Sequence, residues 1–126
     1  MATLNRIAPV LPVRDLAAAM GHYRRLGFDV KAYRGADFYG YANRDEVSLH
    51  LSRVHNPDPT TSNVAIYLYV DDADALAAEW AAADTGGTTN TPADTEYGLR
   101  EGAHIDPDGN LIRFGSPLES GQPKPA

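Results

Sequence analysis

Apolar side chains in this chain show two periodicities: in some segments they recur at every second residue, and in others at every third or fourth residue. The stretch IAPVLPV at residues 7–13 is short, apolar and typical of a strand. Over residues 16–26 the apolar side chains instead fall on one face of a helix, with Asp15 as a good N-cap and Gly27 where the helix should end. The first part of the chain therefore predicts a strand followed by a helix.

The same arrangement returns in the second half of the chain. VAIYLYV at residues 64–70 predicts a strand, and Asp72 precedes a helical run over residues 73–84. Trp80 lies on the apolar face of this run and is expected in the core. One constant spacing relates three pairs of residues: Val13 and Val70, Asp15 and Asp72, and Tyr23 and Trp80. The constant spacing indicates an internal repeat.

Each helix is followed by a pair of strands in which apolar and polar side chains alternate. In the first half, residues 36–42 and 47–54 flank a turn at 43–46. In the second half, residues 99–105 and 110–116 flank an Asp-Pro-Asp-Gly-Asn turn. The chain therefore predicts an α+β fold built from two β-α-β-β-β modules.

These modules set the predicted domain organisation. They cover about residues 5–55 and 62–117, within one domain over residues 1–118. Residues 119–126 are predicted to form a flexible tail, and the segment DTGGTTNTPADTEYG at 84–98 is predicted to be a loop.

The alternation also predicts which side chains face each helix. In residues 64–70 the aliphatic set Ile66, Leu68 and Val70 should lie beneath the helix, and this turns Tyr67 and Tyr69 to the opposite side. In residues 7–13 the set Ile7, Pro9, Leu11 and Val13 should face the helix. The side chains expected to point away from the helices also include Ser48, His50, Leu111 and Arg113. A ligand would bind on this second side of the strands.

Composition narrows the classes of function. The 126 residues carry a net charge of −6 and no basic cluster with interleaved aromatic side chains, which argues against nucleic acid as a partner. The chain has no cysteine, so it has neither disulfides nor thiolate ligands for a metal. No apolar run is long enough to cross a membrane, and the first residues lack the apolar core of a signal peptide. We therefore expect a cytoplasmic protein without membrane contact.

Three stretches of the sequence carry a resemblance to a known family: LPVRD followed by YRRLGF, DFYGYANRDEVSLHLS, and IDPDGN. Together with the paired modules, they resemble the vicinal oxygen chelate superfamily, and within it the bleomycin resistance protein family. The resemblance covers about residues 7–114. It implies a glyoxalase/bleomycin resistance-type fold with a concave sheet.

Metal-dependent members of this superfamily place one ligand on the first strand and one on the last strand of each module. The resemblance assigns these positions to Ala8, His50, Ala65 and Arg113. Alanine offers no ligand atom and arginine keeps a fixed positive charge, so we expect no metal and no other cofactor. The remaining histidines form no second metal site, and His22 is expected on the polar face of its helix.

The resemblance implies instead a protein that binds an antibiotic without reacting with it. In the bleomycin resistance family two chains form a dimer, and each of two grooves at the interface holds one drug molecule. We therefore expect a homodimer that sequesters a cationic, bleomycin-type glycopeptide, because aromatic rings suit planar groups and an acidic rim suits a cationic tail. The candidate ligand-binding residues are Tyr67, Tyr69, His50, Arg113, Phe38, Tyr41, Tyr97 and Ser48.

Plainer interpretations stay open for these residues. Tyr67 and Tyr69 suit a strand whether or not they bind a ligand, and His50 is compatible with a core histidine bonded to a neighbour. A charge on this side of the sheet needs a partner, which for Arg113 is a carboxylate from the set Asp37, Glu96 and Glu101.

Two further functional hypotheses stand beside antibiotic binding. The first is a glyoxalase-like lyase or isomerase, in which His50 is the general base and Arg113 holds a small anionic substrate. The second is a carrier of another natural product. The sequence favours a binding protein over an enzyme.

Overall fold

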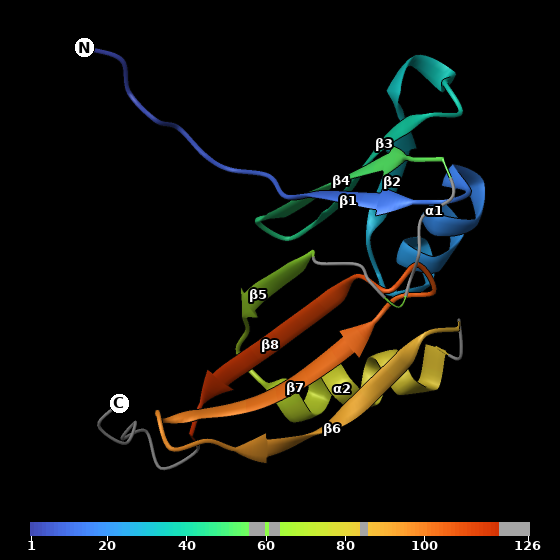
Figure 1. The fold of residues 1–126 in the computed structure, drawn as a ribbon. Coiled ribbons are helices and arrows are strands. Elements are labelled where there is room, and N and C mark those ends of the chain that lie inside the picture. The colour runs from blue at the N-terminus through green and yellow to red at the C-terminus, as the bar shows by residue number, and fades with distance from the viewer. Residues whose placement is uncertain (56–59, 61–63, 84–85, 119–126) are drawn as a thin grey trace. The chain divides into compact units, whose positions relative to one another are not determined.

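The computed structural model, which describes residues 1–55, 60, 64–83 and 86–118, shows the predicted β-α-β-β-β arrangement twice (Figure 1). The chain divides into two compact units, Met1–Pro57 and Asp58–Ala126. Among the described residues each unit has one α-helix and one four-stranded sheet, which confirms the α+β fold class. That residues 1–118 act as one domain stays a prediction, and the tail at 119–126 lies outside the described residues.

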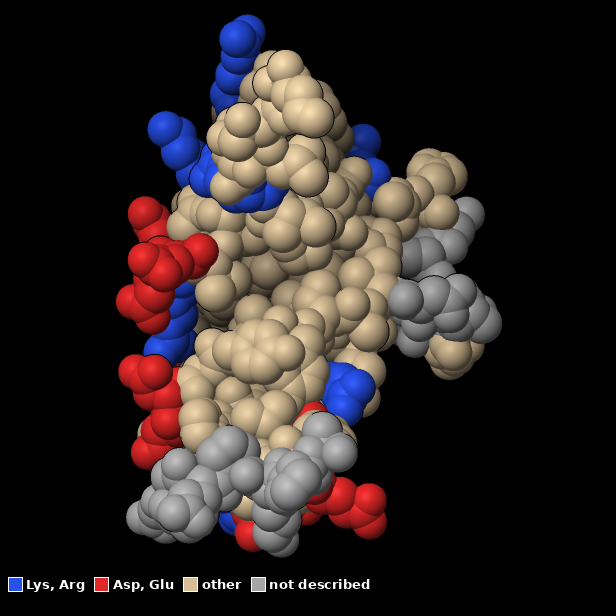
Figure 2. Space-filling model, turned by 90° about the vertical axis from the view of Figure 1, so that its left-hand side faces the viewer, with Lys and Arg blue, Asp and Glu red and all other residues tan. Residues whose placement is uncertain are grey.

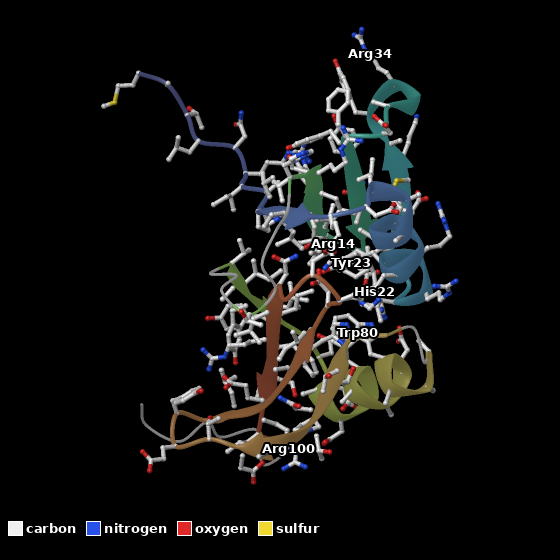
Figure 3. The ribbon with its side chains drawn as sticks, turned by 45° about the vertical axis from the view of Figure 1, so that its right-hand side comes forward. Arg14, His22, Tyr23, Arg34, Trp80 and Arg100 are labelled. Atoms are coloured by element: carbon white, nitrogen blue, oxygen red, sulfur yellow. The ribbon has the colours of Figure 1, made fainter. Side chains whose placement is uncertain are left out.

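The first unit packs α1 on one face of a sheet with strand order β1-β4-β3-β2. Its core lies between them and contains Leu11, Leu49 and Leu51, which are fully buried. Tyr23 points from α1 into this core (Figure 3) and meets Phe28 edge to face, with 5.7 Å between the ring centres. In chain order the elements are β1 (Val10–Val13), α1 (Leu16–Arg25), β2 (Asp29–Ala32), the short 3-10 helix η1 (Tyr33–Gly35), β3 (Tyr39–Arg44) and β4 (Val47–Arg53).

The second unit repeats this plan with strand order β5-β8-β7-β6 beneath α2. Ile112 and Phe114 are fully buried, and Trp80 points from α2 onto the sheet, where its ring lies 5.5 Å from that of Phe114 (Figure 3). The prediction that Trp80 belongs to the core is therefore confirmed. In chain order the elements are β5 (Ala65–Tyr69), α2 (Ala73–Ala83), β6 (Thr88–Asp94), β7 (Leu99–Ile105) and β8 (Leu111–Pro117).

Both helices begin as their sequences predict. The carboxylate of Asp15 accepts a hydrogen bond from the Ala18 backbone N–H at 3.0 Å, and that of Asp72 accepts one from Ala75 at 3.0 Å. The helix α1 ends before Gly27, whose φ of 93° lies in the left-handed region. No helix among the described residues has the length and apolar character needed to cross a membrane.

Of the four side chains predicted to face the first helix, Leu11 and Val13 are fully buried in β1, whereas the prediction for Ile7 is wrong. The strand β1 begins only at Val10, and the Ile7 side chain is 89% exposed. Pro9 has no N–H to give to a ladder, although its carbonyl accepts a hydrogen bond from His50 N at 2.8 Å. Residues 1–9 form an arm that leads away from β1 (Figure 1), because apolar side chains alone do not make a strand without the regular hydrogen bonds of a ladder.

The prediction of a loop over residues 84–98 is wrong for residues 88–94. Residues 88–94 form β6, which pairs with β7 at the edge of the second sheet. Pro92 has no N–H to donate to a ladder, so proline is unusual within a strand. The structure accommodates it by a register shift between Asn90 and Ala93. Residues 84–85 lie outside the described residues.

The placement of His22 on a polar helix face is also wrong. Its side chain is only 2% exposed, and its ring lies edge to face with Tyr23 at 5.2 Å. The period of the helix placed His22 beside the apolar stripe, and an imidazole is apolar enough on its ring faces to be buried when its nitrogens are satisfied.

Candidate ligand-binding site

Side chains from three strands and one turn gather on the side of the second sheet that is turned away from α2. We call this side the second-unit face; it consists of Tyr67, Tyr69, Tyr97, Glu101, Ala103, Leu111, Arg113 and Gly115. Tyr67 on β5 is the direct neighbour of Arg113 on β8, and Glu101 on β7 is the neighbour of Gly115. Because alternate residues share a side, the buried Ile112 and Phe114 fix Arg113 on this face, as the sequence predicted.

Glu101 is the centre of the polar contacts on this face. One carboxylate oxygen accepts a hydrogen bond from Arg113 Nη2 at 2.7 Å, and the other accepts from the hydroxyls of Tyr67 and Tyr97, both at 2.8 Å. Arg113 also approaches the Tyr97 oxygen at 3.4 Å and lies over the Tyr67 ring at 5.4 Å. The four side chains form one cluster, and Glu101 is the partner of Arg113 among the three carboxylates proposed from the sequence.

A missing side chain at Gly115 lets Tyr67 reach Glu101. The Tyr67 ring crosses from β5 over β8, and a Cβ atom at Gly115 would overlap the tyrosine hydroxyl. Any other residue at this position would displace the ring from the carboxylate. Gly115 therefore holds the cluster together although it has no side chain of its own.

The cluster is electrically neutral near pH 7. Burial, followed by the hydrogen bond to Glu101, raises the pKa of Tyr67 well above its usual range. The hydrogen bond to Glu101 also raises the pKa of Tyr97, and the same partner raises the pKa of Arg113. Burial acts to raise the pKa of Glu101, but the hydrogen bonds from Arg113, Tyr67 and Tyr97 outweigh it and lower that pKa. Glu101 is thus ionised, Arg113 balances it, and both tyrosines keep their protons.

Tyr69 extends this face with an open aromatic ring. It is 80% exposed, and its ring centre lies 5.0 Å from that of Tyr67 at an angle of 48°. In Figure 2 uncharged side chains occupy the middle of the surface in view, and acidic side chains line its left-hand edge. A planar group has a surface on which to stack here.

The first unit carries a second aromatic group on the side of its sheet turned away from α1. His50 on β4 is the neighbour of Tyr41 on β3, and their ring centres are 4.9 Å apart. The hydroxyl of Tyr39 is 2.8 Å from His50 Nδ1. His50 is therefore bonded to a neighbour, as the plainer interpretation held, but its side chain is half-buried and does not belong to the core.

Phe38 joins this group through Tyr33. The Tyr33 ring lies 6.4 Å from Phe38 and 6.5 Å from Tyr41, and both Tyr33 and Phe38 are more than one-third exposed. Ser48 lies on the same side but donates its hydroxyl proton to Asn43 Oδ1 at 2.6 Å. Ser48 therefore has a partner within its own hairpin.

The predicted candidates fall into two groups. Tyr67, Tyr69, Tyr97 and Arg113 lie on the second-unit face, and the set Phe38, Tyr41, His50 and Ser48 lies on the first unit. The sequence reasoning did not name Tyr33, which follows β2, and gave Glu101 only as one of three partners for Arg113. The cross-strand register contains the missing signal, because it places Glu101 beside Gly115 and so within reach of Tyr67.

The sequence profile of the Glyoxalase/Bleomycin resistance protein/Dioxygenase superfamily matches residues 3–114. The chain belongs to this superfamily. No curated protein matches it by sequence. The match spans both β-α-β-β-β units and confirms the resemblance given by the sequence motifs.

Solved structures of bleomycin resistance, bleomycin-binding and other antibiotic-binding proteins are similar to this chain over more than nine-tenths of its length. A bleomycin resistance determinant encoded on the transposon Tn5 is 25% identical, with a TM-score of 0.80, over 91% of this chain and 99% of that one. A bleomycin-binding protein from bleomycin-producing Streptomyces verticillus, in complex with copper(II)-bleomycin, is 28% identical, with a TM-score of 0.76, over 92% and 98%. TnmS3, an antibiotic-binding protein from Streptomyces sp. CB03234, is 25% identical, with a TM-score of 0.70, over 93% and 99%.

The residues at the metal-ligand positions of this superfamily do not fit a metal. Ala8 and Ala65 offer no donor atom, and Arg113 is a cation already bound to Glu101. His50 is a single ligand whose Nδ1 is paired with Tyr39. Across the part of the chain that the structure describes, no group of three His, Cys, Asp or Glu side chains comes close enough to hold an ion.

Proposed function

We propose that this protein binds and sequesters a bleomycin-type glycopeptide antibiotic without a metal of its own. Membership of the superfamily supports binding of this general kind, and a relative 28% identical is a bleomycin-binding protein. The observation that carries the proposal is the second-unit face, where the exposed Tyr69 ring lies beside Tyr67 and a neutral Arg113–Glu101 pair.

The chemistry of this face suits a ligand with a planar aromatic part and polar arms. The Tyr69 ring offers a stacking surface, because offset stacking and edge contacts between rings are favourable. The remaining N–H groups of Arg113 can donate to carbonyl oxygens of the ligand, while the tyrosine oxygens can accept from its amides and amines. We propose that Phe38, Tyr41 and His50 on the first unit, with Ser48 near them, contribute further ligand contacts.

The geometry gives less support to the enzymatic alternative. An uncompensated positive charge attracts an anionic substrate most strongly, yet the guanidinium of Arg113 is 2.7 Å from the Glu101 carboxylate, which offsets its charge. Sequestration needs no general base. His50 already takes part in a hydrogen bond with Tyr39, which is consistent with a hydrogen-bonding role. A carrier of another natural product is the second candidate, and the similarity to TnmS3, an antibiotic-binding protein, supports an antibiotic as its ligand.

We propose further that residues 1–118 form one functional domain and that the protein is a homodimer. The superfamily profile spans both units, which supports a single domain. The arm at residues 1–9 supports association, since Met1, Leu4 and Ile7 are almost wholly exposed in the single chain.

Calorimetric titration of the EDTA-treated protein with metal-free and with copper-loaded bleomycin tests the proposed function. We expect saturable binding of both forms at close to one drug molecule per chain. Tyr69→Ala should weaken binding by about 1–3 kcal/mol if the ring stacks on the drug, whereas Tyr69→Phe, which keeps the ring, should bind as the unmodified protein does. Absence of heat with either form of the drug would reject the proposal.

His50→Ala separates sequestration from catalysis. We expect this variant to retain most of its affinity for bleomycin, since the histidine is one contact among several. Mass spectrometry of the drug recovered from the unmodified protein should show no change in mass. A modified drug that disappears with His50→Ala would instead identify an enzyme with His50 as its base.

A further inference from the structure

We infer that Glu101 determines the ligand specificity of the second-unit face: it makes the face neutral and leaves its tyrosine oxygens as hydrogen-bond acceptors, so that cationic and proton-donating ligands are preferred over anions. The inference rests on the proposed function in treating this face as the ligand-binding surface. It adds the chemical class of ligand and the residue that selects it.

The hydrogen bonds fix the polarity of the two tyrosines. A tyrosine hydroxyl has one proton to donate, and both Tyr67 and Tyr97 give theirs to the same carboxylate oxygen of Glu101 at 2.8 Å. The Tyr97 oxygen also accepts a hydrogen bond from Arg113 Nη2 at 3.4 Å, and the capacity that remains on both tyrosine oxygens is lone-pair density. A ligand that approaches these oxygens therefore has to bring an N–H or O–H group.

The charges on the face lead to the same preference. Among the residues that make up the second-unit face, Glu101 and Arg113 are the charged ones, and their ion pair measures 2.7 Å. The Glu101 side chain is only 15% exposed, so the pair is partly screened from water and its charges compensate each other effectively. An anion gains little net attraction from Arg113, while the open Tyr69 ring offers a π face that attracts cations.

Replacing Glu101 by glutamine should reverse this preference. Glutamine has nearly the same shape but no negative charge, and its single oxygen cannot accept all three hydrogen bonds. The guanidinium of Arg113 would then stand uncompensated on the face, and at least one tyrosine hydroxyl would be free to donate. The face would change from neutral to positive.

A pair of aromatic dyes of opposite charge tests the inference independently of the drug. Fluorescence titrations compare the cationic dye thioflavin T with the anionic dye 8-anilinonaphthalene-1-sulfonate in the unmodified protein, E101Q and R113Q. We expect E101Q to move the ratio of affinities toward the anionic dye by about tenfold, the effect of one uncompensated charge at a partly exposed site. R113Q should move it toward the cationic dye.

Asp94→Asn is the matched control for this experiment. It removes one carboxylate from the same sheet, but Asp94 pairs with Arg100, which also binds Asp74 on α2 and so lies on the helix side. D94N should leave the ratio of dye affinities unchanged. If E101Q shifts the ratio no further than D94N does, the inference is wrong.

Alkaline titration of tyrosine absorbance provides a second readout that needs no ligand. In the unmodified protein Tyr67 and Tyr97 should ionise late, and E101Q should bring their ionisation closer to that of ordinary tyrosines. Circular dichroism verifies that the variant is folded, and R113Q, at a half-exposed side chain, provides the test should E101Q fail to fold. An unchanged tyrosine titration in folded E101Q would overturn the inference.

These experiments separate the inference from the proposed function. If bleomycin does not bind but the dye preference follows Glu101 and Arg113, the drug assignment fails and the inference stands. If bleomycin binds and the dye preference ignores both substitutions, the inference fails alone.

Discussion

Gly102 shows at the scale of one residue how tightly the second unit is packed. A Cβ atom built at this position lies 2.8 Å from the Phe114 ring and 3.2 Å from Pro92 Cγ. Because Phe114 is fully buried, the ring has little room to move. Gly102→Ala should therefore lower the free energy of unfolding by about 1–3 kcal/mol, the usual effect of overpacking, as measured by urea denaturation.

Gly21→Ala provides the comparison for this measurement. Gly21 lies in α1, where an added Cβ meets nothing closer than Arg25 Nη1 at 3.8 Å. Alanine favours a helix over glycine by up to about 1 kcal/mol, so the variant should be as stable as the unmodified protein or more so. Equal destabilisation by the two substitutions would contradict the packing argument at Gly102.

The ionisation of Glu101 makes the stability of the protein depend on pH. Its pKa is lower in the folded protein than in the unfolded chain, so its contribution to stability is complete above the unfolded pKa and is lost as pH falls through the folded one. We expect the difference in unfolding free energy between the unmodified protein and E101Q to shrink between about pH 6 and pH 3. Chemical denaturation at several pH values measures it, and a difference that grows toward acid would contradict the lowered pKa.

At the scale of elements, the two helices share one capping device. Asp72 accepts a hydrogen bond from Ala75 N at 3.0 Å, so Asp72→Ala should cost about 1 kcal/mol of stability. The neighbouring Asp71 is exposed, and its replacement by alanine removes the same charge. Asp71→Ala should therefore lower the stability by less than Asp72→Ala does. Thermal unfolding of both variants tests the difference; matching melting temperatures would show that the charge, and not the cap, is what counts.

The elements that the sequence predicted correctly are those with strong local signals. The capping aspartates, the apolar helix faces and the two hairpin turns each depend on residues close together in the chain, and the structure confirms them. The strand β6 depends instead on its pairing with β7, and no local pattern reveals a strand that contains Pro92. Its identification needed the partner strand.

In the candidate site, too, the features that follow from local sequence were predictable and those that depend on distant residues were not. The alternation of side chains was enough to place Tyr67 and Arg113 on one side of a sheet, because that alternation is a local property. The role of Glu101 as a common acceptor was not predictable to the same degree. It depends on the register between β7 and β8 and on the space left by Gly115. A local sequence pattern predicts neither of these.

At the scale of the whole molecule, the N-terminal arm carries apolar side chains that the single chain leaves exposed to solvent. Leu4 is 97% exposed and Ile7 89% exposed, and burying such side chains against a second chain would be favourable. We expect the protein to sediment as a dimer and the double substitution Leu4→Asp, Ile7→Asp to shift it toward the monomer. Thr3→Asp adds a charge to the same arm without removing an apolar side chain, and it should leave the dimer intact. A dimer unaffected by the double substitution would exclude the arm from the interface.

Pro92 also affects how the exposed edge strand β6 can pair with another polypeptide. An edge strand ordinarily presents a regular row of N–H and C=O groups, and such a row is a template on which another polypeptide can pair and start an aggregate. In β6 one donor is missing at Pro92, and the shift between Asn90 and Ala93 breaks the spacing of the rest. This border of the second sheet is therefore protected against recruiting a stray strand, which favours a protein that stays dispersed at high concentration.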